Sequence, residues 1–298
     1  MKKVLVIAND AGCGEILAAY VAAHRAKNDF RVYGAGPAAK IFRRERDTFR
    51  PAPRTRAHME RLMRKNDDVS LVLVGTGWMT SIECDALAAA KKEGLFTAVY
   101  LESWTGYRER FGYPKPGWRK NLPDEIWLGD RAAFALAKKQ FPGTTKLRLV
   151  PNEYFKAVVW RYRLARTKIK PDSILFLSNI DDTTEHVFKE LLERFSHRKG
   201  SPKVRVRFHP ADDRSRFNPL IKKYKRNVRV ERSKEKDIVR DLVRAKSVIG
   251  TETTAMMFGA LLGIRTVSVL PAGKRSSLPF ASIKRRKDAA GAVALLRL

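Results

Sequence analysis

The chain has 298 residues, of which 44% are hydrophobic and 9% aromatic, so it is long enough for two ordinary domains and is not a disordered protein. Lysine and arginine total 61 against 31 aspartate and glutamate, and this charge of +30 favours an anionic partner: a phosphorylated substrate, an acidic membrane face or nucleic acid. Two cysteines cannot form a disulfide framework, which points to a reducing cytoplasm. The first apolar run ends at Asp10 and predicts a core strand, not a signal peptide, and no stretch is long enough for a membrane span.

In the first half of the chain, apolar runs typical of buried strands alternate with segments of helical pattern. The runs lie at 3–8, 30–36, 69–75, 96–102 and 125–129. Helices are expected near 14–27, 55–66, 80–93 and 131–140. Because strand and helix alternate regularly, these strands are expected to form a parallel sheet covered on both faces.

The second half repeats this alternation. Its strand-like runs lie at 173–179, 204–210, 228–231, 247–251 and 266–271, and helices are expected near 181–197, 213–225, 234–245 and 253–263. Between the halves, residues 151–172 form a basic, aromatic segment with a proline near each end. We therefore predict an α/β fold of two doubly wound, Rossmann-like domains that face each other over a cleft. The expected domains are 1–155 and 173–298, with an interdomain linker at 156–172.

The first loop, "NDAGCGE", follows the first strand directly. Gly12 and Gly14 begin a G-x-G-x-x-G pattern, but the third position is Leu17, and no Gly-Lys-Ser/Thr follows, so the loop is neither a dinucleotide fingerprint nor a P-loop. The glycines let the backbone approach a ligand, with Asp10 and Glu15 at the rim. Asp10 is either a general base or the N-cap of the next helix, and both interpretations remain open.

The stretch "RVRFHP" predicts a strand with one basic face that ends at His209 and Pro210. Proline stops the sheet hydrogen bonds, so the imidazole is expected at the carboxyl edge of the sheet. There it can donate to a phosphate oxygen, with Arg207 nearby, or it is merely a surface histidine.

The stretch "GTETTA" lies where the next strand ends and a helix begins. Its hydroxyls and the backbone N–H groups of a helix start are suited to an anion, although a threonine there is as often an ordinary N-cap. With His209 on a neighbouring strand end, the stretch predicts a nucleotide phosphate site. The residues concerned are Gly250, Thr251, Glu252, Thr253 and Thr254.

The loop "ESWTGYRERF" follows another strand end. Glu102 is the rival catalytic base to Asp10, because it lies at the same sheet edge. Trp104 and Tyr107 can stack on a sugar ring while Arg108 and Arg110 hold anions. The alternative is a packed loop with solvated arginines.

The second-half motifs resemble a known family. A strand ending in His-Pro, then "GTETTA" opening a helix and "GIRTVSV" after it, is similar to the donor domain of GT-B glycosyltransferases that make bacterial surface glycans, including the sialyl-, Kdo- and polyol-phosphate-transferase groups. In these families the His-Pro histidine and the Ser/Thr cluster contact the donor phosphate, and the base is an acid in a glycine-containing N-terminal loop. The resemblance implies Asp10 as the base, and His209, Thr251, Thr253 and Thr254 for the donor.

The resemblance implies a metal-independent glycosyltransferase that moves a sugar from a nucleotide-activated donor, bound by the C-terminal domain, to a cell-surface glycan or lipid-linked acceptor. No metal is assigned, since the histidines show no ligand spacing, and no cofactor is expected beyond the nucleotide-sugar substrate. One alternative is an epimerase or hydrolase of UDP-amino sugars with the same architecture. Another is a basic nucleic-acid-binding protein, which rests on charge alone because no specific nucleic-acid motif is present.

The segment 43–65 predicts a basic loop followed by an amphipathic helix that carries Met59, Leu62 and Met63. We expect it to bind the anionic inner face of the cytoplasmic membrane and to hold the protein there as a peripheral enzyme. The alternative is a solvated basic helix. The cations expected to make this contact are Arg43, Arg44, Arg54, Arg56, Arg61 and Arg64.

Overall fold

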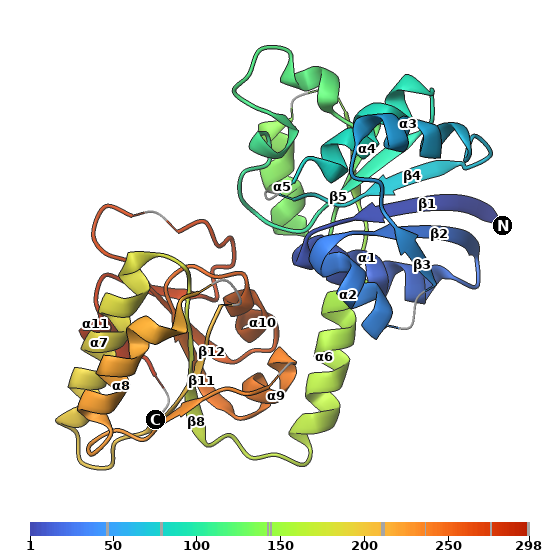
Figure 1. The fold of residues 1–298 in the computed structure, drawn as a ribbon. Helices are drawn as coiled ribbons and strands as arrows, with labels where there is room; N and C mark the ends of the chain where they lie inside the picture. The colour runs from blue at the N-terminus through green and yellow to red at the C-terminus, as the bar shows by residue number, and fades with distance from the viewer. Residues whose placement is uncertain are drawn as a thin grey trace. The chain divides into compact units, whose positions relative to one another are not determined.

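The computed structural model describes residues 1–45, 48–77, 80–141, 143, 145–209, 212–235, 237–274 and 276–296. The chain divides into two compact units, Met1–Lys156 (unit 1) and Ala157–Leu298 (unit 2). Each unit is a parallel sheet with helices on its faces (Figure 1). The predicted fold class of two Rossmann-like α/β domains is confirmed.

Unit 1 contains sheet A, in which strand β1 pairs with β2 on one side and with β4 on the other. The strand order is β3-β2-β1-β4-β5-β6-β7, and all pairs are parallel. The strands are β1 (Lys2–Ala8), β2 (Asn28–Gly34), β3 (Phe49–Pro51), β4 (Leu71–Val74), β5 (Thr97–Leu101), β6 (Glu125–Leu128) and β7 (Lys146–Leu149). The central strands are continuous apolar runs because helices cover both of their faces.

The helices of unit 1 begin and end close to the predicted positions, with one addition, α2. They are α1 (Ala11–His24), α2 (Gly36–Arg44), α3 (Arg56–Arg64), α4 (Ile82–Lys92) and α5 (Arg131–Gln140). Helix α3 buries Met59 and Met63 fully inside the unit. Its apolar face is therefore part of the core, and its arginines lie on the exposed face.

Unit 2 contains sheet B, with the parallel order β10-β9-β8-β11-β12-β13. The strands are β8 (Ser173–Leu177), β9 (Lys203–Arg207), β10 (Val230–Arg232), β11 (Ala245–Gly250), β12 (Arg265–Val269) and β13 (Lys284–Arg286). The helices are α7 (Asp182–Ser196), α8 (Asn218–Tyr224), α9 (Ile238–Val243), α10 (Ala255–Leu261) and α11 (Ala289–Val293). A core of aromatic and aliphatic side chains centred on Phe176 and Phe188 fills the space between sheet and helices.

The predicted linker is largely helical. Helix α6 (Glu153–Arg166) is continuous across the boundary between the units, and an extended segment then leads from it into β8 (Figure 1). It contains no proline or glycine, so nothing in its sequence interrupts a helix. In the described part of the chain, no helix is both long and apolar enough to cross a membrane.

Candidate functional site

In both sheets the strand order reverses beside the first strand of the unit, between β1 and β4 in sheet A and between β8 and β11 in sheet B. Ligands of open α/β sheets bind beyond the carboxyl ends of the strands at this switch point. The residues that follow β1, β4 and β5 in unit 1, and β8, β9 and β11 in unit 2, are therefore the candidates in each unit.

Asp10 lies at the switch point of sheet A. It occupies the N-cap position of α1 with an extended backbone, but its side chain makes no capping hydrogen bond to the described start of that helix. Its Oδ1 accepts a hydrogen bond of 3.0 Å from Asn9 Nδ2. A Cβ atom on Gly77, just beyond β4, would come within 2.9 Å of the Asp10 Cγ atom. The carboxylate thus lies against the ends of both strands at the switch point.

Glu83, in the first turn of α4, holds the loop that carries Asp10. Its Oε1 accepts hydrogen bonds from the backbone N–H groups of Asn9, at 2.8 Å, and Asp10, at 3.3 Å. Burial raises the pKa of Glu83. Burial, followed by the charge of Glu83, also raises the pKa of the Cys13 thiol well above its ordinary value, which is consistent with a packing role for that cysteine.

Glu102, the rival base, is engaged at both carboxylate oxygens. Arg110, whose side chain is only 2% exposed, donates to Oε1 at 2.6 Å, and the Thr76 hydroxyl donates to Oε2. Arg110 also donates to the Thr76 hydroxyl at 2.7 Å. A Cβ on Gly12 would lie 3.0 Å from the Glu102 Cγ, so Gly12 gives the room that this side chain needs. The Glu102 carboxylate thus ties three strand-end loops together, those that follow β1, β4 and β5.

The aromatic residues expected to stack on a sugar are buried, and we correct that expectation. Trp104 is 5% exposed and donates from Nε1 to Asp130 Oδ2 at 2.9 Å. Tyr107 is 2% exposed, stacks on Phe141, and has its pKa raised by burial. The alternative of a packed loop describes them better. Arg108 was expected to hold an anion, and its guanidinium lies 4.2 Å from the centre of the Tyr113 ring.

Gly12 and Gly14 lie in the first turns of α1, which begins earlier than the sequence predicts. A Cβ on Gly14 would approach the Ala38 Cα and Cβ to 2.9 Å, so its small size is required by the packing of α1 on α2. Glu15 forms a two-pronged ion pair with Arg44, with distances of 3.0 and 2.6 Å. The packing of unit 1 explains Gly14 and Glu15 without a ligand.

His209 follows β9 at the switch-point edge of sheet B. Its backbone N–H donates to Ser178 Oγ at 2.8 Å, and that hydroxyl donates to Asp212 Oδ2 at 2.6 Å. Arg216 pairs with Asp212 at 2.9 Å. Burial lowers the pKa of His209, and Asp212 partly offsets this. The backbone of His209 is therefore held at the strand end, while Pro210 lies outside the described residues.

The threonines of "GTETTA" do not act as a single group. The Thr251 hydroxyl is buried and donates to Asp181 Oδ2 at 3.2 Å, with the Thr184 hydroxyl 3.0 Å away. Thr253 is also buried, whereas Thr254 is exposed and precedes α10. The Thr251 hydroxyl thus has a structural role at the start of α7, which differs from the predicted phosphate contact. Gly250 is required because a Cβ there would meet the Leu177 carbonyl oxygen at 2.7 Å.

Glu252 anchors the loop that follows β12. Its two oxygens accept hydrogen bonds from the Ser276 hydroxyl at 2.7 Å and from the Ser277 N–H and hydroxyl at 2.7 and 2.9 Å. In the same loop, Lys274 donates to the Thr183 hydroxyl at 2.9 Å, at the start of α7. Sequence reasoning missed Lys274 and Ser178. Ser178 follows β8 directly, and the strand-end rule used for Asp10 would have found it.

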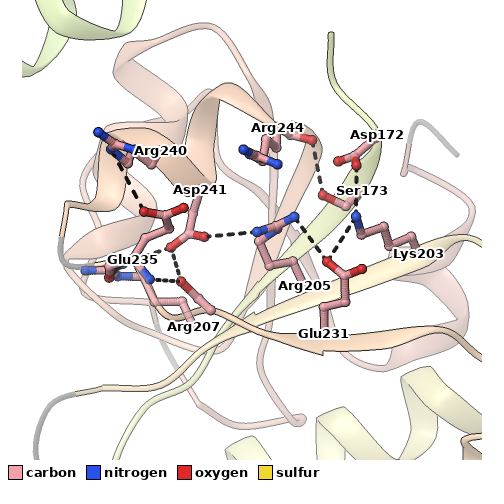
Figure 2. A network of polar contacts seen from close by, with 11 residues as sticks. Asp172, Ser173, Lys203, Arg205, Arg207, Glu231, Glu235, Arg240, Asp241 and Arg244 are labelled. Carbon is pink, nitrogen blue, oxygen red and sulfur yellow. Dashed lines mark hydrogen bonds and ion pairs between the residues drawn. The ribbon is translucent and has the colours of Figure 1, made fainter. Parts of the chain in front are cut away.

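Arg207 is paired with a buried carboxylate. Figure 2 shows it beside Asp241, which is fully buried on α9, with Arg205 on the other side. The Arg207 guanidinium donates to Asp241 Oδ2 at 2.8 Å and to the Glu235 carbonyl oxygen at 2.9 Å. The basic face of β9 was predicted correctly, but its cations pair with the buried Asp241 and the partly exposed Glu231. Across the described residues, no group of His, Cys, Asp and Glu side chains has an arrangement suited to a metal ion.

No protein-family model matches the sequence, and no curated protein matches it. Solved structures do resemble it. The UDP-GlcNAc 2-epimerase from Neisseria meningitidis bound to UDP-GlcNAc gives a TM-score of 0.63 at 12% identity, over 93% of this chain and 84% of that chain. Anabaena HepE in complex with UDP-glucose gives 0.64 at 8%, over 99% and 89%. MurG from Acinetobacter baumannii gives 0.59 at 11%, over 98% and 87%. At these identities the likeness shows a GT-B type fold.

Proposed function

We propose that this chain is a GT-B type glycosyltransferase that transfers a sugar from a nucleotide-activated donor to a glycan or lipid-linked acceptor at the inner face of the cytoplasmic membrane. The observation that carries the proposal is the held His209 at the switch-point edge of sheet B, in a fold whose solved neighbours include structures with UDP-sugars. An imidazole N–H is a suitable donor to a phosphate oxygen, and Lys274 adds a positive charge at the same edge.

In this proposal Asp10 takes the proton from the acceptor hydroxyl as its oxygen attacks the anomeric carbon. The bond between that carbon and the donor phosphate oxygen breaks, and the nucleotide leaves with both bonding electrons. His209 and Lys274 stabilise the charge that develops on the leaving phosphate. Glu83 and Glu102 hold the loops around Asp10 and are positioning residues.

A thermal-shift and calorimetric screen against CMP, CDP, UDP, GDP and their sugars tests the proposal. One of these is expected to stabilise the protein, and His209→Ala is expected to abolish the effect. His186→Ala is the matched control, because that histidine is exposed, with 65% side-chain exposure, on the neighbouring helix α7. The proposal fails if no nucleotide or nucleotide sugar binds.

A second candidate, a nucleotide-sugar epimerase or hydrolase, is favoured by one observation. Asp10 and the buried Glu83, whose pKa is raised, form two carboxyl groups in different environments, as acid–base pairs often do. The donor identified above should be incubated in D2O without acceptor. Deuterium in the sugar, or nucleotide release without acceptor, would show this second activity. Release that requires an acceptor would show transfer.

A further inference from the structure

A group of exposed cations of unit 2 lies at the edge of sheet B opposite to the candidate site. Three loops enter the neighbouring strands β8, β9 and β10 at their amino ends, and each loop carries a pair of exposed cations. The pairs are Lys168 with Lys170, Arg198 with Lys199, and Lys225 with Arg226. These six side chains, on loops that enter neighbouring strands about 4.8 Å apart, are here called the basic edge.

The loops of the basic edge contain almost no acidic residue. Helices of both units end at the amino edges of their sheets, where cations are favourable. In unit 1 the loops entering β4, β5 and β6 carry Asp67, Asp68, Glu93 and Asp124, whereas the loop entering β2, the counterpart of β9, carries the exposed Arg25 and Lys27 and no acid. In the loops of unit 2 that enter β8, β9 and β10, all of whose residues are described, the one acid is Asp172, which pairs with Lys203 at 2.9 Å. The three loops of the basic edge thus carry the six named cations and one acid, which is already paired.

An exposed apolar pair lies on the helix that leads into the basic edge. On α6, Trp160 is 65% and Leu164 is 56% exposed, and they lie one turn apart on the same face of the helix. Arg163 is exposed beside them, and Lys168 follows Leu164 by four residues. Exposed tryptophan and leucine flanked by cations are typical of segments that lie in a membrane interface.

The segment predicted from sequence to bind the membrane is less suitable. Arg44 is paired with Glu15 and Glu45, Arg56 with Glu60, and Arg64 with Glu93. The methionines of α3 face the core of unit 1. That surface therefore combines partly neutralised arginines with no exposed apolar anchor among its described residues.

We propose that the basic edge and the α6 pair form a docking surface for an anionic phospholipid bilayer, with Trp160 and Leu164 inserted between head groups and the six cations on lipid phosphates. The apolar pair favours a bilayer over nucleic acid, because a leucine gives no stacking surface to a base. This proposal is independent of the reaction that the protein catalyses.

Co-sedimentation with phosphatidylcholine vesicles, with and without phosphatidylglycerol, tests it on the full chain. Wild type should bind only the anionic vesicles. Replacing Lys168, Lys170, Arg198 and Lys199 by Gln should weaken binding at least about 100-fold, since each cation near the surface contributes about fivefold. The matched control replaces Arg54, Arg56, Arg61 and Arg64 by Gln, and it should weaken binding less than about fivefold.

Brominated lipids test the insertion directly. They should quench part of the wild-type tryptophan emission, and Trp160→Phe should lose this part, since the described Trp104, Trp118 and Trp127 are buried. The proposal is wrong if the unit 1 variant loses binding and the unit 2 variant keeps it, or if Trp160→Phe leaves quenching unchanged. It is also wrong if poly(U) binds through the basic edge while anionic vesicles do not.

Discussion

The buried carboxyl group of Glu83 makes the stability of unit 1 depend on pH. Glu83 accepts two backbone N–H groups at the base of the Asp10 loop and is buried, which raises its pKa above 4.5. The folded state therefore binds more protons than the unfolded state above that pH, and Glu83 lowers stability as pH rises through its folded pKa. Glu83→Gln keeps the hydrogen-bond acceptor but removes the titrating group. It should therefore lose less stability than wild type between about pH 5 and pH 8, measured by urea unfolding.

Glu83→Ala separates the two effects of this side chain. It removes the charge and also the acceptor, leaving buried N–H groups without a partner, and should cost about 1–3 kcal/mol relative to Glu83→Gln at either pH. Equal stability of the two variants would contradict the view that Glu83 holds this loop through its hydrogen bonds.

His209 gives the opposite pH dependence. Burial lowers its pKa below 6.5, so the unfolded state binds more protons as pH falls through 6.5, and wild type loses stability in that direction. His209→Gln should lose less stability than wild type between about pH 7.5 and pH 5.5, in thermal unfolding followed by circular dichroism. A steeper loss in the variant would show that the imidazole is not held neutral.

Asp10 is tested by a change that preserves its shape. Asp10→Asn should leave the affinity for the nucleotide unchanged and reduce kcat about 10²–10⁴-fold, the range of general base catalysis. Asp29→Asn, at an exposed position on β2, is the control for the loss of one charge. Retained turnover in Asp10→Asn would contradict the assignment of Asp10 as the base.

At the scale of elements, the approach of α1 to α2 decides the effect of a glycine substitution. Alanine favours a helix over glycine by about 1 kcal/mol, but a Cβ on Gly14 would meet the Ala38 backbone at 2.9 Å. Because backbone cannot yield easily, Gly14→Ala should destabilise unit 1 by about 1–3 kcal/mol in denaturant unfolding. Ala23→Gly, on the exposed face of α1, measures the helix propensity alone. A stabilised Gly14→Ala variant would contradict the close packing of α1 on α2.

The sequence predicted the buried central strands well and the strands at the sheet edges poorly. β1 and β8 are apolar runs because both of their faces are covered. The edge strand β13 consists of three exposed cations and becomes a strand only through its hydrogen bonds to β12. The sequence of α6 predicts a linker instead of a helix, because its mixture of aromatic and basic residues has no clear apolar face.

The sequence predicts which strand ends carry the candidate site residues. Asp10, Glu102 and His209 all follow strands whose positions were correct, so topology alone brings them to the sheet edges. Partners that meet through space could not be predicted. No spacing in the sequence pairs Glu102 with Arg110 in particular, or Arg207 with Asp241, and these contacts decide which charges remain available.

For the whole molecule, the two units have separate cores, centred in unit 1 on Leu17 and Phe42 and in unit 2 on Phe176 and Phe188. A nucleotide that binds the edge of sheet B should therefore stabilise unit 2 directly. At a concentration of 100 times its Kd it contributes about 2.7 kcal/mol to the state that binds it. Hydrogen exchange should slow in the loops that follow β8, β9 and β12 of unit 2, and not in the loop that carries Asp10.

Because the two units have separate cores, hydrogen exchange with bound nucleotide tests which unit holds the donor. His209→Ala should abolish the protection in unit 2, whereas Asp10→Asn should retain it, because Asp10 is assigned to the acceptor. Protection that appears in the Asp10 loop with nucleotide alone, and that survives His209→Ala, would place the nucleotide on sheet A. The roles proposed for the two sheets would then have to be exchanged, even if the enzyme class were correct.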